Sequence, residues 1–240
     1  MGKSGKIAYF MAVLGIIMVL LSLGGVITLG GEKHAGSVHR FLSSGPAVGE
    51  ERAVPGGTAG KYRIVIDPGH GGKDPGATSM SGREEKDFTL ALAEKVYERL
   101  EQDPMFEPVL TRTSDEFIEL EDRSKVANEL HANAFISLHG NTYEGSEPVS
   151  GTETYYYNKG DGSYELAEMI HQHLIEALGF RDRGVRQEGW KVLRTSEVPA
   201  VLAEIGFLTN AENESVLFSE AGQDKAAQAI VDALKQYFGK

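Results

Sequence analysis

The chain has 240 residues and contains no cysteine. This absence excludes disulfide bonds, cysteine-ligated zinc, iron–sulfur clusters, a cysteine nucleophile and a lipidated N-terminal cysteine. Any metal site must therefore be built from His, Asp or Glu. Basic residues are also scarce, because 24 Lys and Arg stand against 35 Asp and Glu, for a net charge of −11. Binding of a phosphate backbone needs clustered Lys and Arg, so this balance argues against a nucleic acid partner.

Several signatures of common catalytic sites are also absent. The helical zinc motif H-E-x-x-H and the nucleophile elbow G-x-S-x-G do not occur in the sequence. The Gly-rich segment Gly69–Gly76 satisfies neither the GxxxxGK[ST] phosphate loop nor the GxGxxG dinucleotide motif. A glycosidase with two catalytic carboxylates remains open because Asp and Glu are plentiful, but it would leave His70 and His139 without a role.

The N-terminal segment has one long apolar run. Ile7–Leu29 holds 23 uncharged residues after Lys3 and Lys6, which is enough to span a hydrocarbon core of ~30 Å at ~1.5 Å per residue. The two lysines favour a cytoplasmic N-terminus, so the rest of the chain would lie outside the cytoplasm. A cleaved signal peptide is the alternative, although its apolar region usually runs for only about 7–15 residues. Residues 1–29 are therefore expected to anchor the protein in the membrane, or to be removed on secretion.

Two further segments follow. Residues 30–60 contain eight Gly and two Pro with little apolar material, which indicates a flexible linker. Residues 61–240 have the composition of a globular domain and carry 19 basic and 32 acidic residues. Short apolar or β-branched runs alternate there with helical patterns, which predicts a single layered α/β domain with a mainly parallel twisted sheet flanked by helices. We expect strands at 63–66, 107–111, 134–138, 152–157 (nearer an edge) and 200–204, a short strand at 192–193, and helices at 89–100, 123–130, 163–178 and 221–238.

Three polar side chains occur at the ends of expected strands. His70 follows the first strand in a Gly-rich turn, His139 follows the strand at 134–138, and Glu204 ends the strand at 200–204. In open α/β sheets the ligand crevice lies beyond the carboxyl ends of the parallel strands, so these side chains are expected to converge. Neutral imidazole and carboxylate are good zinc ligands, and a catalytic zinc keeps three protein ligands and an open position. A further carboxylate can then act as a general base.

The segment Gly82–Asp87 supplies more carboxylates just before the helix at 89–100. One of them is a candidate third ligand. The alternative is a solvated acidic helix start, which the helix dipole favours. The residues by themselves leave both interpretations open.

Seven motifs occur in order along the domain: IVIDPGHGGKDPGA (64–77), EKDFTLALA (85–93), LTRTSDEF (110–117), RSKVANELHANAFISLHGN (123–141), GTETYYY (151–157), RGVRQEGWKVLR (183–194) and PAVLAEIGFLTNAEN (199–213). In these motifs residues 64–240 resemble the zinc-dependent N-acetylmuramoyl-L-alanine amidases of bacterial cell walls, the amidase-3 family. The resemblance covers most of the domain, and the joint order and spacing of the motifs make it specific.

The resemblance implies a set of functional residues. The family's Zn²⁺ ligands fall on His70, Glu85 and His139, and its catalytic glutamate falls on Glu204. Glu85 is chosen over Glu84 because the family's ligand directly precedes the Lys-Asp pair. The implied reaction is hydrolysis of the amide bond between the lactyl group of N-acetylmuramic acid and L-alanine of the stem peptide in peptidoglycan. Gly140, where the family usually has Ala, and Leu138, where Ile is common, remove no ligand.

Other polar residues have two open interpretations each. Asp67 and Asn141 either orient ligands from behind or stabilise turns. Arg112 and Arg123 either bind substrate carboxylates in a bidentate manner or form structural ion pairs. The tyrosines at 155–157 suit an edge strand or a sugar-stacking platform, and Trp190 suits the groove or the core. His131, His171 and His173 lie on expected helical stretches and are not expected to be ligands.

Two rival functions remain. One is a zinc-retaining wall-binding module without turnover, against which the intact Glu204 argues. The other is a glycan-cleaving hydrolase, which would produce reducing ends instead of free peptide. The sequence does not distinguish vegetative wall from spore cortex as the substrate, and it identifies no protein activator.

Overall fold

The computed structural model describes residues 60–145 and 149–239. The expected anchor at 1–29 and the linker at 30–60, except its last residue Gly60, lie outside these ranges. Among the helices of the described ranges, none combines the length and the apolar character that crossing a bilayer requires.

Six strands form one sheet in the order β2-β1-β3-β6-β4-β5. The first four strands in this order run parallel to one another, β4 runs antiparallel to β6, and β5 runs parallel to β4. The predicted α/β domain with a mainly parallel sheet is therefore confirmed. The strands are β1 (Tyr62–Pro68), β2 (Phe106–Leu110), β3 (Ala134–Asn141), β4 (Thr152–Tyr156), β5 (Asp182–Gln187) and β6 (Ala200–Phe207).

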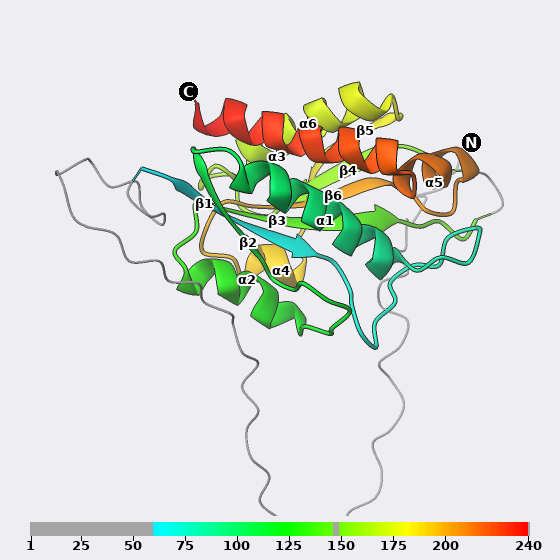
Figure 1. Cartoon of the computed structure of the whole chain (residues 1–240), viewed down its shortest axis with the longest axis horizontal. Coiled ribbons are helices and arrows are strands. Elements are labelled where there is room, and N and C mark those ends of the chain that lie inside the picture. The colour runs from blue at the N-terminus through cyan, green and yellow to red at the C-terminus, as the bar shows by residue number, and fades with distance from the viewer. Residues whose placement is uncertain (1–59, 146–148, 240) are drawn as a thin grey trace, which may run out of the picture. The chain divides into compact units, whose positions relative to one another are not determined.

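Helices cover both faces of the sheet (Figure 1). The first face is covered by α1 (Glu85–Glu101), α3 (Ser163–Leu178) and α6 (Glu220–Phe238), with the short α5 (Ala211–Leu217) beside them. The second face is covered by α2 (Leu120–Glu129) and the single turn α4 (Lys191–Arg194).

Strand alternation divides the core between the two faces. Ile64 and Ile66 of β1 pack against the helices of the first face, while Val65 between them packs with Ala127 of α2. Successive side chains of a strand point to opposite faces, so a strand covered on both faces needs a continuous apolar run. This requirement explains the fully buried Ile-Val-Ile segment that leads into the functional end of the sheet.

Local signals place the helix boundaries. Gly179 ends α3 in the left-handed conformation with φ 68°, as its sequence position predicts. The Ser219 side chain caps α6 by accepting a hydrogen bond from the Gly222 N–H. These signals explain why the expected helices at 163–178 and 221–238 agree with the structure to within a residue.

The sequence expectations for the segments 152–157 and 180–217 need correction. The short strand expected at 192–193 is wrong, because these residues form the helical turn α4 and bury both side chains in the second core. β4 lies inside the sheet, between β6 and the edge strand β5. Neither β5 nor α5 was expected. β5 has the sequence DRGVRQ and is exposed at both ends, so it carries no apolar alternation by which to recognise it.

Candidate metal centre

The expected convergence of strand ends occurs on the second face of the sheet. His139 of β3 pairs directly with Glu204 of β6, and Glu204 pairs directly with Glu153 of β4. On the other side of β3, Gly69 follows β1 and donates its N–H to the Leu138 carbonyl at 3.0 Å. Side chains directly opposite one another on neighbouring strands point to the same face. His139, Glu204 and Glu153 therefore form a row across three strands at the carboxyl end of β3 and β6.

His70, Glu85 and His139 form a compact triangle of ligand atoms. His70 Nε2 lies 3.1 Å from Glu85 Oε1, and His139 Nδ1 lies 3.0 Å from the same oxygen and 3.1 Å from His70 Nε2. Ligands bound tetrahedrally to zinc at about 2.0–2.1 Å lie about 3.3 Å from one another. The triangle thus has nearly the dimensions of one face of a zinc tetrahedron, and its two nitrogens and one carboxylate oxygen are donors that zinc favours.

Glu85 is fixed by hydrogen bonds from the backbone. It is the first residue of α1, and its carboxylate accepts the Gly140 N–H on Oε1 at 2.9 Å and the Ala77 N–H on Oε2 at 2.8 Å. Glu84, the neighbouring candidate, is half exposed and pairs with Lys86. The structure therefore brings Glu85, and not Glu84, to the two histidines.

His70 is oriented by a residue that sequence reasoning missed. Its Nδ1 lies 2.9 Å from Asp74 Oδ2, and because an ionised carboxylate only accepts, Nδ1 carries the proton and donates. Nε2, the atom in the triangle, is therefore the nitrogen that would give its lone pair to a metal, with release of its own proton. Asp74 stands four residues after His70 in the same Gly-rich turn, and this spacing is the signal that could have found it.

In the triangle, burial and neighbouring charges shift the pKa values of the three ligand side chains. Burial by itself lowers the pKa of His70, but the carboxylates of Glu85 and Asp74 raise it to about 10. Burial raises the pKa of Glu85, yet His70 and His139 hold it well below its usual range. Burial and the neighbouring His70 lower the pKa of His139. Glu85 therefore stays ionised, and it supplies a negative charge where a cation would bind.

Glu204 is a buried carboxylate with a free oxygen. The residue is only 8% exposed, and among the buried side-chain nitrogen and oxygen atoms of the described residues its Oε2 is the one without a hydrogen-bond partner. Burial raises the pKa of Glu204 well above its ordinary value, and the negative charges of Glu85 and Glu153 raise it further. A buried polar atom normally has a partner, so this oxygen fits a site that receives a water or substrate proton.

Arg112 and Arg123 are buried, and they bind groups at the end of β1 and in the turn that follows it. Their residues are 1% and 2% exposed. Arg112 donates to the carbonyls of Pro68 and Gly69, among others. Arg123 donates to the His70 carbonyl and forms a buried ion pair with Asp67 at 3.0 Å.

Asp67 and Asn141 act at a distance from the triangle. The two Asp67 oxygens accept hydrogen bonds from Arg123, Thr111 and Ser137, so Asp67 fixes the end of β1. Asn141 donates to Glu153 Oε2 at 2.8 Å. Glu153 is the second residue that sequence reasoning missed, since its place beside Glu204 depends on the antiparallel pairing of β4.

The remaining aromatic and histidine candidates lie elsewhere. Tyr155 is buried and packs against Trp190, with ring centroids 4.2 Å apart and the ring planes tilted by 38°. Tyr157 is 40% exposed. The three histidines not expected to be ligands lie outside the triangle. His171 bonds to Asp182 and Thr154. His131 is not helical but follows α2 with φ 48°.

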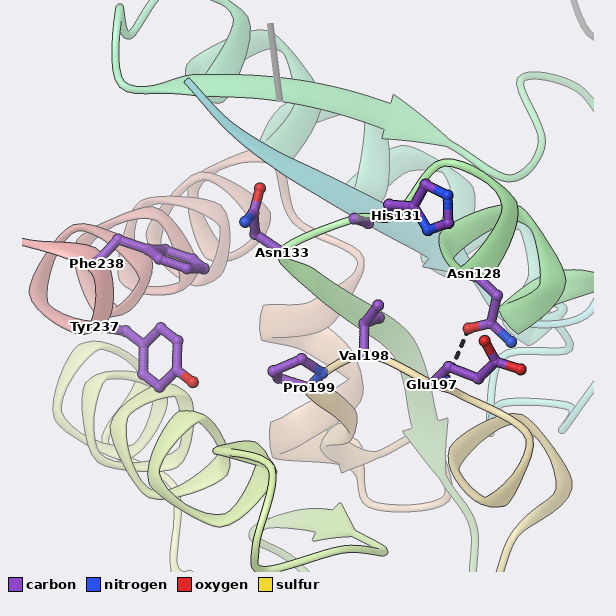
Figure 2. A pocket seen from close by; sticks show the side chains of 9 residues that line it. Asn128, His131, Asn133, Glu197, Val198, Pro199, Tyr237 and Phe238 are labelled. Atoms are coloured by element: carbon purple, nitrogen blue, oxygen red, sulfur yellow. Dashed lines mark hydrogen bonds between the residues drawn. The ribbon is translucent and has the colours of Figure 1, made fainter. Parts of the chain in front are cut away.

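A hollow of about 440 Å³ lies at the opposite end of the sheet (Figure 2). Its lining comes from the segments that precede β3 and β6 and from the end of α6. Its polar side chains serve the local fold: Asn128 accepts the Glu197 N–H and donates to the Thr195 carbonyl, and Asn133 accepts the Arg63 N–H. The hollow therefore contains none of the residues of the triangle.

Comparison with known proteins agrees with this geometry. A family model described as N-acetylmuramoyl-L-alanine amidase matches residues 64–236. The chain belongs to the N-acetylmuramoyl-L-alanine amidase family. Its sequence is 36% identical over 229 residues to N-acetylmuramoyl-L-alanine amidase LytC of Bacillus subtilis, covering 92% of this chain and 45% of that protein. The chain thus spans less than half the length of LytC.

Solved amidase structures share the fold. The catalytic domain of CwlV from Bacillus (Paenibacillus) polymyxa var. colistinus is 44% identical with a TM-score of 0.71, over 74% of this chain and 98% of that one. CwlD of Clostridioides difficile, in complex with the GerS lipoprotein, is 30% identical with a TM-score of 0.70, over 75% of this chain and 99% of that one. The triangle of His70, Glu85 and His139 is therefore the candidate metal centre of an amidase-family enzyme.

Proposed function

We propose that this protein is a zinc-dependent amidase that hydrolyses the bond between the lactyl group of N-acetylmuramic acid and L-alanine of the stem peptide in peptidoglycan. His70 Nε2, Glu85 Oε1 and His139 Nδ1 would hold the zinc. When bound, zinc would supply polarisation of the amide carbonyl and a lower pKa for the attacking water. The observation that carries the proposal is the triangle of three donor atoms at 3.0–3.1 Å beside the unpartnered Glu204 oxygen.

The protein's own residues supply the proton transfers. Glu204 Oε2 takes a proton from the attacking water as the carbonyl carbon is attacked, and the same carboxyl group then gives that proton to the leaving nitrogen of L-alanine. Burial raises the pKa of Glu204 above its ordinary value, which is the direction required of a carboxyl group that must both accept and return a proton. Asp74 and the backbone N–H groups of Ala77 and Gly140 keep His70 and Glu85 in place throughout.

The test is product analysis on purified peptidoglycan. We expect soluble stem peptides with a free N-terminal L-alanine and no new reducing ends. A chelator should abolish the release of stem peptides, and addition of zinc should restore it. Release of reducing ends would indicate a glycan-cleaving hydrolase instead. Binding to the wall without any release would indicate a wall-binding module.

We further propose the cellular setting. Residues 1–29 form a membrane anchor, with signal cleavage as the alternative, residues 30–60 form a linker, and residues 61–240 form the catalytic domain, which acts outside the cytoplasm. The substrate is vegetative wall or spore cortex, and mass spectrometry of the products from each wall type distinguishes them. The complex of CwlD with a lipoprotein supports a search for a protein activator.

A further inference from the structure

Beside Glu204, in the row across the sheet, lies a second buried carboxylate, Glu153, to which the proposed reaction assigns no role. Glu153 is directly opposite Glu204 in the β4–β6 pairing, and its residue is 4% exposed. In contrast to Glu204, both of its oxygens are fully engaged. Oε2 accepts hydrogen bonds from Asn141 Nδ2 at 2.8 Å and from the Tyr155 hydroxyl at 2.7 Å.

The other oxygen of Glu153 binds two arginines of the edge strand β5. Arg183 Nε lies 2.8 Å from Oε1, and Arg186 Nη2 lies 3.4 Å from the same oxygen. The Arg183 guanidinium also lies 5.2 Å from the ring of Phe207, which belongs to the strand that carries Glu204. Two cations are thus bound to the carboxylate that lies directly opposite Glu204, and Glu204 keeps one oxygen without a partner.

An arginine beside a buried, unpartnered carboxylate would normally pair with it, because a bidentate guanidinium–carboxylate pair is among the strongest side-chain interactions. Such a pair would occupy the oxygen that must accept a proton. We infer that Glu153 is a positioning residue that binds the guanidinium groups of Arg183 and Arg186 and thereby keeps Glu204 Oε2 free for proton transfer. This inference rests on the proposed function, since it assigns Glu153 a task in that reaction.

The first variant to test is Glu153→Gln, which keeps the side-chain shape and removes the charge that holds the arginines. We expect kcat for stem-peptide release to fall roughly tenfold to a hundredfold, a part of what general acid–base catalysis contributes, while KM and bound zinc stay near wild type. The matched control is Glu107→Gln, which breaks the Arg63–Glu107 ion pair on β1 and β2 and should leave kcat unchanged.

Removal of the arginines separates this role from a merely structural one. In the triple variant Glu153→Gln/Arg183→Gln/Arg186→Gln no guanidinium from β5 remains to pair with Glu204, so most of the lost kcat should return. If Glu153→Gln does not fold, the triple variant still tests the inference, because removing both partners of a buried pair costs less than removing one. A triple variant that folds and is as slow as Glu204→Gln would overturn it.

A crystal structure gives a readout that does not depend on activity. In Glu153→Gln, the guanidinium of Arg183 or Arg186 should lie within hydrogen-bond distance of a Glu204 oxygen. Arginines that stay in place, or an unchanged kcat, would contradict the inference. If wild-type protein releases no stem peptide in the same assay, the proposed function fails, whereas the positions of the arginines still decide the role of Glu153.

Discussion

At the scale of single residues, the backbone around Glu85 decides which of two adjacent glutamates can bind a metal. The N–H groups of Gly140 and Ala77 hold the Glu85 carboxylate beside both histidines, whereas Glu84 faces solvent and pairs with Lys86. The sequence of the segment 82–87 does not by itself distinguish Glu84 from Glu85 as a metal ligand. The choice of Glu85 came from the resemblance to the family, and spacing within the segment 82–87 did not decide it.

The first prediction compares these two glutamates. Glu85→Ala should lose bound zinc because one of three protein ligands disappears, while Glu84→Ala should retain it. Metal content after dialysis of both purified variants is the measurement. Loss of zinc in Glu84→Ala with retention in Glu85→Ala would mean that the carboxylate is wrongly assigned.

The second prediction concerns Glu204 and pH in the metal-free protein. Folding raises the pKa of this acid above its ordinary value of 4.5, so the native state favours the protonated form. Below pH 4.5 this carboxyl group is protonated in both states, so it does not lower the free energy of unfolding. As the pH rises from 4.5 toward the folded-state pKa, the group ionises more readily in the unfolded state, and the free energy of unfolding falls. Glu204→Gln removes the charge, so the variant should be more stable than wild type at about pH 8, with a difference that shrinks toward about pH 4.5.

Urea unfolding of both chelator-treated proteins across this pH range measures the effect. The same variant should lose about 10²- to 10⁴-fold in kcat, as expected for a general base. A wild-type protein that gains stability over Glu204→Gln as the pH rises would contradict the described environment of the carboxylate.

At the scale of elements, the loop between β1 and α1 depends on close backbone approach. Gly76 has φ 68°, and a Cβ at this position would lie 2.6 Å from Glu85 Oε2 and 2.7 Å from His70 Cδ2. Gly82, further along the same loop, has φ 82° but no atom within 4 Å of such a Cβ. The two glycines share the left-handed backbone conformation, which would strain any residue with a Cβ, and they differ in what surrounds them.

The third prediction uses this difference. Gly76→Ala and Gly82→Ala should each lose about 1–2 kcal/mol of stability from the left-handed backbone. Only Gly76→Ala should also weaken zinc binding, since its methyl group displaces two ligands. Zinc affinity by competition with a chromophoric chelator is the measurement. Equal zinc affinities in the two variants would show that the close packing at Gly76 does not position the ligands.

The elements also show what the sequence predicts well and why. Ile64–Ile66 form a continuous apolar run because both faces of the sheet are covered. The buried residues of α1 recur at helical spacing. β5 is polar, and the Val192–Leu193 pair is too short for its period to separate strand from helix. Glu153 could not be predicted for a different reason, since only the pairing of β4 with β6 brings it beside Glu204, whereas Asp74 could have been found from its spacing to His70.

At the scale of the whole molecule, the order of the strands creates the site. Parallel β1, β3 and β6 bring His70, His139 and Glu204 to one end, and the sequence predicts this convergence from the strand ends alone. The antiparallel orientation of β4, by contrast, was not predicted, and this orientation places Glu153 opposite Glu204.

The fourth prediction concerns the N-terminal segment. If residues 1–29 are an anchor, full-length protein should sediment with membranes and resist extraction by high salt, while a chain starting at Lys61 should stay in the supernatant and keep its activity on purified wall. Sequencing of the mature N-terminus supplies the control, because a chain that begins after residue 29 would support signal cleavage instead.

The most direct test of the proposed metal centre is an anomalous-diffraction map of zinc-loaded crystals. We predict one strong peak bonded to His70 Nε2, Glu85 Oε1 and His139 Nδ1 at about 2.0–2.2 Å, with a solvent ligand within hydrogen-bond distance of Glu204 Oε2. A peak elsewhere in the molecule, or no peak at these three atoms in protein that cleaves peptidoglycan, would contradict it.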